Sequence, residues 1–328
     1  MSENLKFSVL LSVYSKEKRK NLELSLKSIY DDQILKPDEI VLVEDGPLTE
    51  ELYAEINHQL DKLKGILKIV KLEKNSGLGN ALKEGVLHCT YEWIARMDTD
   101  DIAYPERFKK QIEYIKENSD TDVLGTFMTE FIDEITNKIC VKDAPIDNID
   151  NYIKYRDPVN HPSVILRKSK VLEAGNYQEI FLNEDSYLWA RMYSIGAKFA
   201  NIPEELVYFR VDDNTYKRRG GWKYIKAEWK LQKEYLRLGI INKIDRIKKE
   251  LIIEKIKELN DELEFDYIIP VSAMLREGIS DILKRIEELL PNGPKYYSED
   301  EYTDQTVREM CEEIIRGKAL KLLNQEIP

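Results

Sequence analysis

Residues 93–101 read Trp-Ile-Ala-Arg-Met-Asp-Thr-Asp-Asp. The first half is mainly apolar and suits a short β-strand, whereas the second half carries carboxylates at Asp98, Asp100 and Asp101. Strands of α/β proteins commonly end in this way, because their ligands bind beyond the carboxyl ends of the strands. The stretch therefore predicts a buried strand that leads directly into a polar site.

Strand and helix patterns alternate on both sides of this stretch. Apolar runs predict strands at 7–13, 39–43, 67–72 and 93–97, and amphipathic stretches predict helices at 18–30, 52–63, 77–89, after Glu106 to about Glu117, 184–195 and 222–238. Residues 118–180 look less regular. Alternating strands and helices indicate a parallel, doubly wound α/β sheet. The polar clusters at 44–46 and 98–101 then lie at its carboxyl edge.

The pattern restarts near residue 240. It predicts a strand at Leu238–Ile241, a helix at 246–264, a strand at Tyr267–Val271, a helix at 279–290, a Pro/Gly linker at 291–294 and a last helix at 304–324. A chain of 328 residues is long enough for about two domains. We therefore predict one domain over 1–240 and a second segment over 241–328.

The composition excludes several classes of protein. Hydrophobic residues make up 42% of the chain and charged residues of both signs 34%, which indicates folded cores rather than disorder. The net charge of -11 argues against nucleic acid as a partner, because phosphate backbones require a basic surface. A local basic strip at 217–219, with Lys223 and Lys226, is suited to acidic lipid or a diphosphate.

The cysteines and the apolar runs bear on location. Cys89, Cys140 and Cys311 are far apart and fit neither a disulfide framework nor a metal site. No apolar signal segment is present at the start, and no run approaches the roughly 18 apolar residues of a membrane span. The expectation is a soluble cytoplasmic protein that contacts the inner face of a membrane peripherally.

The carboxylates at 98–101 suggest a metal. Three carboxylates within four positions repel one another unless a cation or hydrogen-bond donors compensate them. Mg²⁺ and Mn²⁺ prefer oxygen ligands and commonly bridge a carboxylate and a diphosphate. The alternative interpretation is a solvated turn in which Asp101 caps the next helix.

Residues 7–240 resemble the family-2 glycosyltransferases of the GT-A fold, the nucleotide-diphospho-sugar transferase fold, particularly those that build cell-surface polysaccharides. The matching segments are Ser8-Val-Leu-Leu-Ser-Val-Tyr14, Val43-Glu-Asp-Gly46, Asn75-Ser-Gly-Leu-Gly-Asn-Ala-Leu82, Ala95-Arg-Met-Asp-Thr-Asp-Asp101 and Asn183-Glu-Asp-Ser-Tyr-Leu-Trp189. Five segments in the family's order make chance a poor explanation. The resemblance implies an inverting, metal-assisted transferase that moves a sugar from a nucleoside-diphosphate sugar, expected to be UDP-linked, to a hydroxyl of a glycan or lipid-linked acceptor.

The resemblance also implies how the donor is held. Asp45 would accept a hydrogen bond from the base, Asp98 would contact the ribose, and Asp100 would bind Mn²⁺ or Mg²⁺. Asp45 is alternatively an Asp-Gly turn residue, and the other polar residues are alternatively helix-end or surface ion-pair residues. The expected donor-binding residues are Val13, Tyr14, Glu44, Asp45, Asn75, Gly77, Lys83, Arg96, Asp98 and Thr99.

The acceptor side is assigned by the same resemblance. Asp185, with Glu184 beside it, would be the general base that deprotonates the acceptor hydroxyl. The alternative is that both acids simply favour the start of a helix through its dipole. His161 matches a family position that lines the acceptor side, although a histidine beside proline is often structural. Arg210 and Arg218 belong to a segment that resembles the one closing over the donor diphosphate.

Residues 241–328 resemble a different family, the Era GTPases. Asn242-Lys-Ile-Asp245 fits a guanine-specificity motif and Pro270-Val-Ser-Ala273 its partner loop, so Asn242, Lys243, Asp245, Ser272 and Ala273 are candidate vestigial guanine-binding residues. Leu290 to Asp304 and Glu312 to Lys318 extend the match. The alternative is that Asn242 and Asp245 cap a helix that starts near Arg246.

This second segment is expected to lack GTPase activity. No G-x-x-x-x-G-K-[ST] loop occurs in the chain, so nothing cradles the β and γ phosphates, and the resemblance stops before the RNA-binding KH domain. We predict a partial α/β GTPase-like fold, present as a passenger or scaffold. Its uncovered sheet edge would need a covering partner or self-association.

Two other functions remain open from the sequence. A sugar nucleotidyltransferase has a related sheet, but its glycine-rich loop after the first strand is replaced here by Tyr14-Ser-Lys-Glu-Lys. A nucleotide-binding or ribosome-associated adaptor would act through the Era-like segment. Binding of labelled GTP would distinguish the adaptor, and release of pyrophosphate the nucleotidyltransferase.

Overall fold

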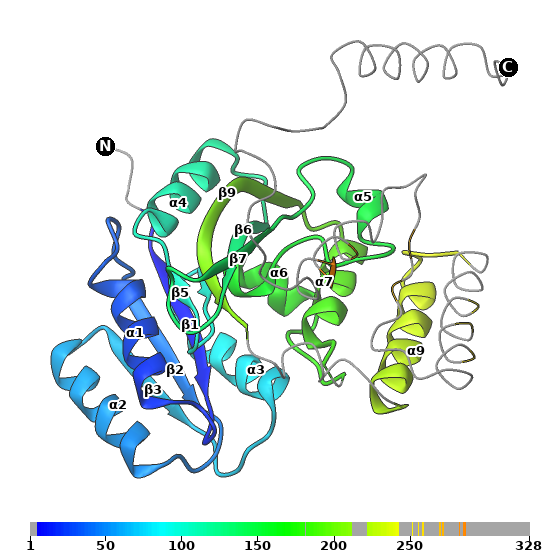
Figure 1. The fold of residues 1–328 in the computed structure, drawn as a ribbon. Helices are drawn as coiled ribbons and strands as arrows, with labels where there is room; N and C mark the ends of the chain where they lie inside the picture. The colour runs from blue at the N-terminus through cyan, green and yellow to red at the C-terminus, as the bar shows by residue number, and fades with distance from the viewer. Residues whose placement is uncertain are drawn as a thin grey trace, which may run out of the picture. The chain divides into compact units, whose positions relative to one another are not determined.

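The computed structural model describes residues 5–180, 182–211 and 222–242, with side chains from residue 226 onward in the last range, and isolated positions between 251 and 286 (Figure 1). The chain divides into two compact units, residues 1–255 and 256–328, and the fold below belongs to the first. Within the described residues no helix is both long and apolar enough to cross a membrane. Apart from these isolated positions, the predicted helices at 246–264, 279–290 and 304–324 and the strand at Tyr267–Val271 lie outside the described residues.

The first four strands form the expected parallel arrangement, in the spatial order β3-β2-β1-β4. Their bounds are Phe7–Val13 for β1, Glu39–Glu44 for β2, Leu67–Lys71 for β3 and Trp93–Arg96 for β4. The register pairs Val13 with Glu44 and Leu10 with Arg96. The carboxyl ends of β1, β2 and β4 therefore meet at one edge of the sheet.

Helices cover both faces of these strands, as a doubly wound sheet requires (Figure 1). Leu10 packs in one core with α3 (Leu78–His88), whereas Val9 and Leu11 pack in the other with α1 (Arg19–Tyr30) and α2 (Glu50–Lys62). Burial on both faces explains why β1 is a nearly continuous apolar run instead of an alternating one. Helix α2 starts at a cap in which Thr49 Oγ1 accepts a hydrogen bond from the Leu52 amide at 3.3 Å.

The second half of the sheet is mixed, so the sheet is not parallel throughout. After β4 the order continues β8-β6-β9-β5; β8 is antiparallel to β4 and to β6, whereas β9 is parallel to β6. Strand β7 pairs with the free side of β6. The bounds are Ile102–Ala103 (β5), Val123–Phe131 (β6), Lys138–Lys142 (β7), Ile165–Arg167 (β8) and Phe199–Arg210 (β9).

Short helices connect these strands, and a longer one follows them. Their bounds are Arg107–Glu117 (α4), Ile149–Tyr152 (α5), His161–Ser163 (the 3₁₀ helix η1), Lys168–Glu173 (α6), Glu184–Ser194 (α7) and Trp222–Arg237 (α9). Helix α4 contributes to the same core as α1 and α2, and helices α7 and α9 to the core of α3. Helices α7 and α9 both match the sequence prediction closely.

The prediction that residues 118–180 are irregular is wrong, because this region holds β6, β7 and β8. Strand β6 is buried at almost every position but contains polar Thr126, Thr129 and Glu130. Thr129 is satisfied by hydrogen bonds with Glu205 and Tyr104, which lie far away in sequence. Buried polar residues that depend on distant partners interrupt the apolar pattern by which a strand is recognised.

The strand predicted at Leu238–Ile241 is also wrong. These residues form the turn that ends α9, with Gly239 at φ +73°. The Ile240 amide donates to the Tyr235 carbonyl at 2.9 Å and the Gly239 amide to the Leu236 carbonyl at 3.2 Å, which is the Schellman pattern of a helix end. Ile240 and Ile241 are apolar because they enter the core beside α9, not because they belong to a sheet.

The loop that follows β2 makes a close backbone contact with the loop that precedes α3. Gly46 has φ +82°, and a Cβ atom there would lie 2.4 Å from the Asn75 nitrogen. Gly65 has an almost identical φ of +84°, but a Cβ atom there would meet nothing within 4 Å. An alanine at Gly65 therefore meets only the cost of the backbone conformation, whereas an alanine at Gly46 also meets a steric clash.

We expect Gly65→Ala to lower the free energy of unfolding by about 1 kcal/mol, because left-handed backbone disfavours alanine. Gly46→Ala should cost about 2 kcal/mol more, because the loop at 74–75 must also move. Urea unfolding followed by tryptophan fluorescence measures both. Equal losses in the two variants would show that the loops are not held in contact.

Candidate functional site

The loop after β2 is tied to the loop before α3 through Asp45. Asp45 is buried, and its Oδ1 and Oδ2 atoms accept hydrogen bonds from the backbone amides of Ser76 at 2.6 Å and Gly77 at 3.1 Å. Asn75 Nδ2 donates to the Asp45 carbonyl at 3.3 Å. Three predicted donor-binding residues, Asp45, Asn75 and Gly77, are thus brought together. Each carboxylate oxygen keeps further acceptor capacity for a ligand.

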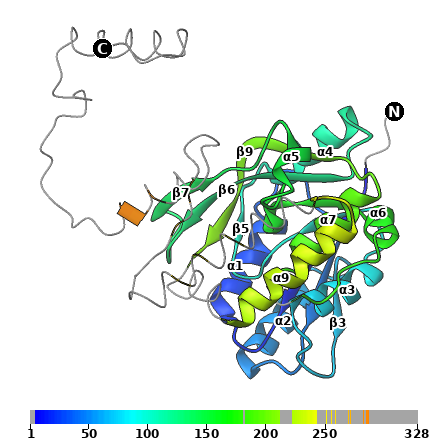
Figure 2. The ribbon, with the colours of Figure 1, turned by 90° about the vertical axis from the view of Figure 1, so that its right-hand side faces the viewer.

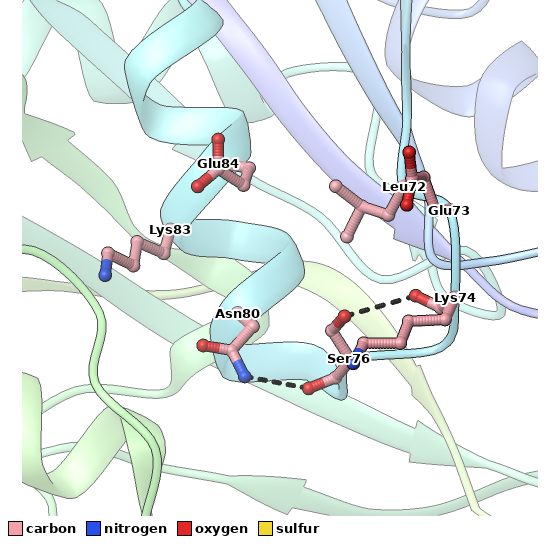
Figure 3. A pocket seen from close by; sticks show the side chains of 7 residues that line it. All are labelled: Leu72, Glu73, Lys74, Ser76, Asn80, Lys83 and Glu84. Carbon is pink, nitrogen blue, oxygen red and sulfur yellow. Dashed lines mark hydrogen bonds between the residues drawn. The ribbon is translucent and has the colours of Figure 1, made fainter.

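A hollow of about 370 Å³ opens between this loop and the start of α3 (Figure 3). Lys83, predicted to reach donor phosphates, lines it together with Lys74, Ser76 and Asn80. Asn80 Nδ2 donates to the Ser76 carbonyl at 2.9 Å and so fixes the first turn of α3 against the loop. The hollow is open to solvent, and its wall carries two lysines, Lys74 and Lys83, and two glutamates, Glu73 and Glu84.

The other predicted residues of this edge are placed as follows. Val13 ends β1 in the core, and its carbonyl accepts the Asp45 amide at 2.8 Å. Tyr14, the next residue, is exposed. Glu44 is buried at the end of β2 and lies 3.5 Å from Lys71 Nζ. These three residues therefore surround the point where the β2 loop leaves the sheet.

Arg96 ends β4 and lies beneath the acidic loop, with 1% of its surface exposed. Its Nη2 is 2.6 Å from Asp98 Oδ1, and its Nε and Nη1 make no hydrogen bond with the residues that the structure describes. Burial alone would lower the pKa of Arg96, but the Asp98 carboxylate raises it overall, so the guanidinium stays charged. Arg96 therefore supplies a buried positive charge to the acidic loop.

The acidic loop is fixed at its far end by β9. Asp101 Oδ1 accepts the Arg210 backbone amide at 2.8 Å, and Arg210 Nε donates to the Asp100 carbonyl at 2.9 Å. Arg210 Nη1 donates to the Asp133 carbonyl at 2.7 Å. The alternative in which Asp101 caps the next helix is wrong, because α4 starts only at Arg107 and Asp101 bonds β9 instead.

Crowding of carboxylates perturbs this loop. Burial and the neighbouring carboxylates of Asp98 and Glu17 raise the pKa of Asp100 to about 7. Burial and the carboxylates of Asp100 and Asp98 raise the pKa of Asp101 well above its ordinary value. Glu17 Oε2 accepts a hydrogen bond from Thr99 Oγ1 at 2.9 Å. Glu17 was missed in the sequence because it sits in an unremarkable polar stretch after β1.

The loop has a donor set suited to a hard divalent cation. No three His, Cys, Asp or Glu side chains are grouped for metal binding among the described residues. Mg²⁺ and related ions, however, are commonly held by one or two carboxylates together with substrate phosphates. Asp98 and Asp100 are partly exposed oxygen ligands, and the raised pKa of Asp100 reports repulsion that a cation would relieve. The residues present therefore fit such an ion.

Glu184 and Asp185 occupy the first turn of α7, as predicted. Burial and the adjacent Asp185 carboxylate raise the pKa of Glu184 to about 7. Asp185 Oδ1 accepts the Ser186 amide at 2.8 Å. The start of α7 lies against the start of α3, where a Cβ atom on Gly79 would be 3.2 Å from Glu184 Cβ. The acid pair is thus held next to the loop that Asp45 organises.

His161, predicted to line the acceptor side, is buried in η1. Its Nε2 hydrogen-bonds the Tyr177 hydroxyl at 2.9 Å, and its ring meets Trp189 edge-on at 5.8 Å. Burial and the nearby Arg96 lower the pKa of His161 well below its ordinary value, so the ring is neutral. Tyr177 was missed in the sequence; it lies within electrostatic reach of Arg96, Glu184 and Asp185.

Some predicted residues fall outside the described part of the chain. Arg218, Lys243, Asp245, Ser272 and Ala273 are among them. Asn242 is described and is exposed just after the turn that ends α9. The guanine-binding interpretation of the second segment and the closing role of Arg218 stay predictions.

Residues 8–175 match the profile of the family described as "Glycosyl transferase family 2". The chain is 44% identical over 234 residues to the amylovoran biosynthesis glycosyltransferase AmsE of Erwinia amylovora, across 71% of this chain and 86% of that one. It is 36% identical over 245 residues to the UDP-Gal:alpha-D-GlcNAc-diphosphoundecaprenol beta-1,3-galactosyltransferase of Escherichia coli, across 74% and 87%.

Solved structures share the fold. S. aureus TarS 1-349 in complex with UDP-GlcNAc superposes with a TM-score of 0.56 at 21% identity, over 71% of this chain and 67% of that one. The mannosyltransferase PcManGT of Pyrobaculum calidifontis, in complex with GDP-Man and Mn²⁺, gives 0.51 at 13% identity, over 72% of each chain. The predicted GT-A-like α/β fold is therefore confirmed.

A separate similarity concerns a smaller part of the chain. GTPase Era of Clostridium novyi is 43% identical over 89 residues, which are 27% of this chain and 30% of that one. The chain thus spans less than a third of that relative.

We expect Asp100→Asn to stabilise the metal-free protein by about 2 kcal/mol more at pH 8 than at pH 5. The pKa of Asp100 is raised from 3.8 to about 7, so the folded state binds more protons than the unfolded state between these values. Stability from this group is therefore lost as pH rises through that window. Urea unfolding at both pH values, with exposed Asp120→Asn as control, measures the effect. Equal effects of Asp100→Asn at both pH values would contradict it.

Proposed function

Because the chain belongs to glycosyl transferase family 2, we propose that it transfers a sugar from a UDP-linked donor to a hydroxyl of a lipid-linked glycan acceptor in polysaccharide synthesis. The observation that carries the proposal is the acidic loop at 98–101. Buried Arg96 compensates the negative charge of Asp98, and both residues are close enough to Glu184 of α7 to influence its pKa. Two relatives, a glycosyltransferase of amylovoran biosynthesis and a galactosyltransferase named for a diphosphoundecaprenol-linked sugar, support the acceptor class.

The donor is proposed to lie along the carboxyl ends of β1, β2 and β4. Asp45 is positioned by the amides of Ser76 and Gly77 and accepts from the imide of the base with its remaining lone pairs. Asp98, held by Arg96 at 2.6 Å, contacts the ribose. Lys83, which lines the hollow, is proposed to reach the donor phosphates. The complexes of S. aureus TarS 1-349 with UDP-GlcNAc and with UDP support this donor.

A divalent cation, Mn²⁺ or Mg²⁺, is proposed to be held by Asp100 together with the donor diphosphate. When bound, it neutralises negative charge on the leaving nucleoside diphosphate. Asp101 is fully buried; its Oδ1 accepts the Arg210 amide, whereas its Oδ2 makes no hydrogen bond with the described residues. The hydrogen bond from Thr99 to Glu17 ties the acidic loop to the loop after β1. Asp100 therefore lies near carboxylates from both loops.

Asp185 is proposed as the general base. It takes the proton of the acceptor hydroxyl while the acceptor oxygen forms a bond to the anomeric carbon and the bond from that carbon to the phosphate oxygen breaks. The products are the glycoside and the nucleoside diphosphate, and this single displacement inverts the anomeric configuration. Glu184 lies beside the base, and burial together with the Asp185 carboxylate raises the pKa of Glu184 to about 7.

Arg96 and Tyr177 are proposed to position the carboxylates of the donor side and of the acceptor side. Arg96 pairs with Asp98, and its charge favours the ionised forms of Asp100 and Glu184. Tyr177 and its hydrogen-bond partner His161 are both uncharged, so they add no second positive charge near Arg96. His161 therefore acts through Tyr177 and not as a proton carrier.

The proposed domain division is a transferase over 1–240 and an Era-derived segment over 241–328. The 89-residue similarity to GTPase Era supports it. The sequence lacks a phosphate-binding loop, so this segment is proposed to add no GTP hydrolysis. Membership in family 2 makes the sugar nucleotidyltransferase interpretation unnecessary.

We expect Asp185→Asn to lower kcat for transfer by about 100-fold or more with little change in the donor KM, because the base is lost. Glu184→Gln should lower kcat less than about tenfold. It should also flatten the pH profile between pH 6 and 8, because the substituted amide mimics the protonated Glu184, whose pKa is about 7. Initial rates of UDP release measure both variants, with Glu179→Gln as control. A larger loss in Glu184→Gln than in Asp185→Asn would overturn the assignment of the base.

We expect UDP to bind the full chain only with Mn²⁺ or Mg²⁺, and Asp100→Ala to weaken that binding by about tenfold or more. Calorimetry with UDP, GDP and dTDP, each with and without EDTA, tests donor and metal together. Tight UDP binding that survives EDTA would contradict the metal. GDP binding that survives Asp100→Ala would instead favour a guanine-nucleotide role for the second segment.

A further inference from the structure

Helix α9 carries a row of exposed basic residues with a tryptophan among them. Lys226, Lys230, Lys233 and Arg237 are spaced by three or four residues, and Trp229 lies three positions after Lys226 and four before Lys233. The five residues therefore share one side of the helix, and all are exposed. Trp229 has 41% of its surface in solvent, although large aromatic rings are normally buried in soluble domains. We call these five residues the basic face of α9.

The charge on this face contrasts with that of the whole chain, which is -11. Lys226 and Lys233 make no hydrogen bond or ion pair with the residues that the structure describes. Arg237 pairs with Glu234 at 2.7 Å, and Glu234 also accepts from Tyr187, so that acid is already compensated. Lys226, Lys230 and Lys233 are exposed, so their ammonium groups can meet an external anion.

The opposite side of α9 is anchored to the start of α7 (Figure 2). Tyr187 Oη donates to Glu234 Oε2 at 3.0 Å, and Tyr235 Oη donates to the Ser186 carbonyl at 3.4 Å. Ser186 and Tyr187 directly follow the acid pair at 184–185. The basic face is thus separated from the proposed acceptor side by the thickness of about one helix.

We propose that the basic face of α9 docks the protein on an anionic lipid surface. Lysines beside a tryptophan suit the interface of a bilayer, where the ammonium groups meet lipid phosphates and the indole ring lies among the headgroups. This surface deepens the proposed function, on which it rests, because it brings the acceptor side of the site toward a membrane that holds a lipid-linked acceptor. The charge of the face, opposite to that of the chain, selects an anionic partner.

The test is binding of the full chain to vesicles, measured by sedimentation without donor or acceptor. Vesicles of equal parts phosphatidylcholine and phosphatidylglycerol should bind the protein at least about tenfold more tightly than pure phosphatidylcholine, and salt should weaken the binding. The triple variant Lys226→Gln, Lys230→Gln, Lys233→Gln should lose about tenfold or more. A matched triple, Lys64→Gln, Lys109→Gln, Lys116→Gln, removes three exposed lysines elsewhere and should bind like the wild type.

Trp229→Ala tests the aromatic part of the face. It should weaken vesicle binding several-fold, and Trp229→Phe should restore most of it while removing the blue shift of tryptophan fluorescence that binding produces. Transfer to a short-chain, water-soluble acceptor should be unchanged in the lysine triple variant, whereas transfer to acceptor in anionic vesicles should fall. This pair of assays separates the surface from the chemistry of the site.

Equal binding of the wild type and the α9 triple variant to anionic vesicles would overturn the proposal, and so would no preference for anionic over neutral lipid. Tighter, α9-dependent binding to single-stranded RNA than to vesicles at the same salt would overturn it in favour of nucleic acid. Vesicle binding that depends on the basic face, without any sugar transfer, would support the surface while removing the proposed function.

Discussion

The rest of the candidate site depends on the positive charge of Arg96, which is buried beneath the end of β4. A buried guanidinium is costly unless carboxylates face it, and here Asp98 does so at 2.6 Å. The same charge favours ionisation of Asp100 and Glu184, which belong to different loops. Carboxylates proposed for the donor and for the acceptor thus share one counter-charge. His161 and Tyr177, packed on the same side, remain neutral beside it.

The three aspartates of the acidic loop differ in what they are free to do. Asp101 is fully buried and bonds the backbone of β9, so it joins the parallel half of the sheet to the mixed half. Asp98 is held by Arg96, and Asp100 is left with the raised pKa. A cluster that looks uniform in sequence is divided by its surroundings into an anchoring residue and two ligand-facing ones. The division depends on Arg210, more than a hundred positions away.

The parallel strands, their helices and the edge where ligands bind could be predicted from sequence, because burial on two faces leaves continuous apolar runs that end in polar residues. Strand β6 could not, because Thr129 depends on Glu205 and Tyr104 for its hydrogen bonds. Asp45, Asp98 and Asp185 were found through motifs. Glu17 and Tyr177 were not, because their importance arises from what lies beside them in space.

The turn that ends α9 has a consequence for how this chain can be joined to other sequences. Gly239 reverses the backbone so that Ile240 and Ile241 cover the core beside α7 and α9. A foreign sequence joined before this point would remove Ile240 and Ile241, the apolar side chains that pack in the same core as the helix that carries Glu184 and Asp185. A sequence joined after it meets an exposed Asn242 and leaves the core intact. A sequence joined after Ile241 would therefore leave the first fold complete.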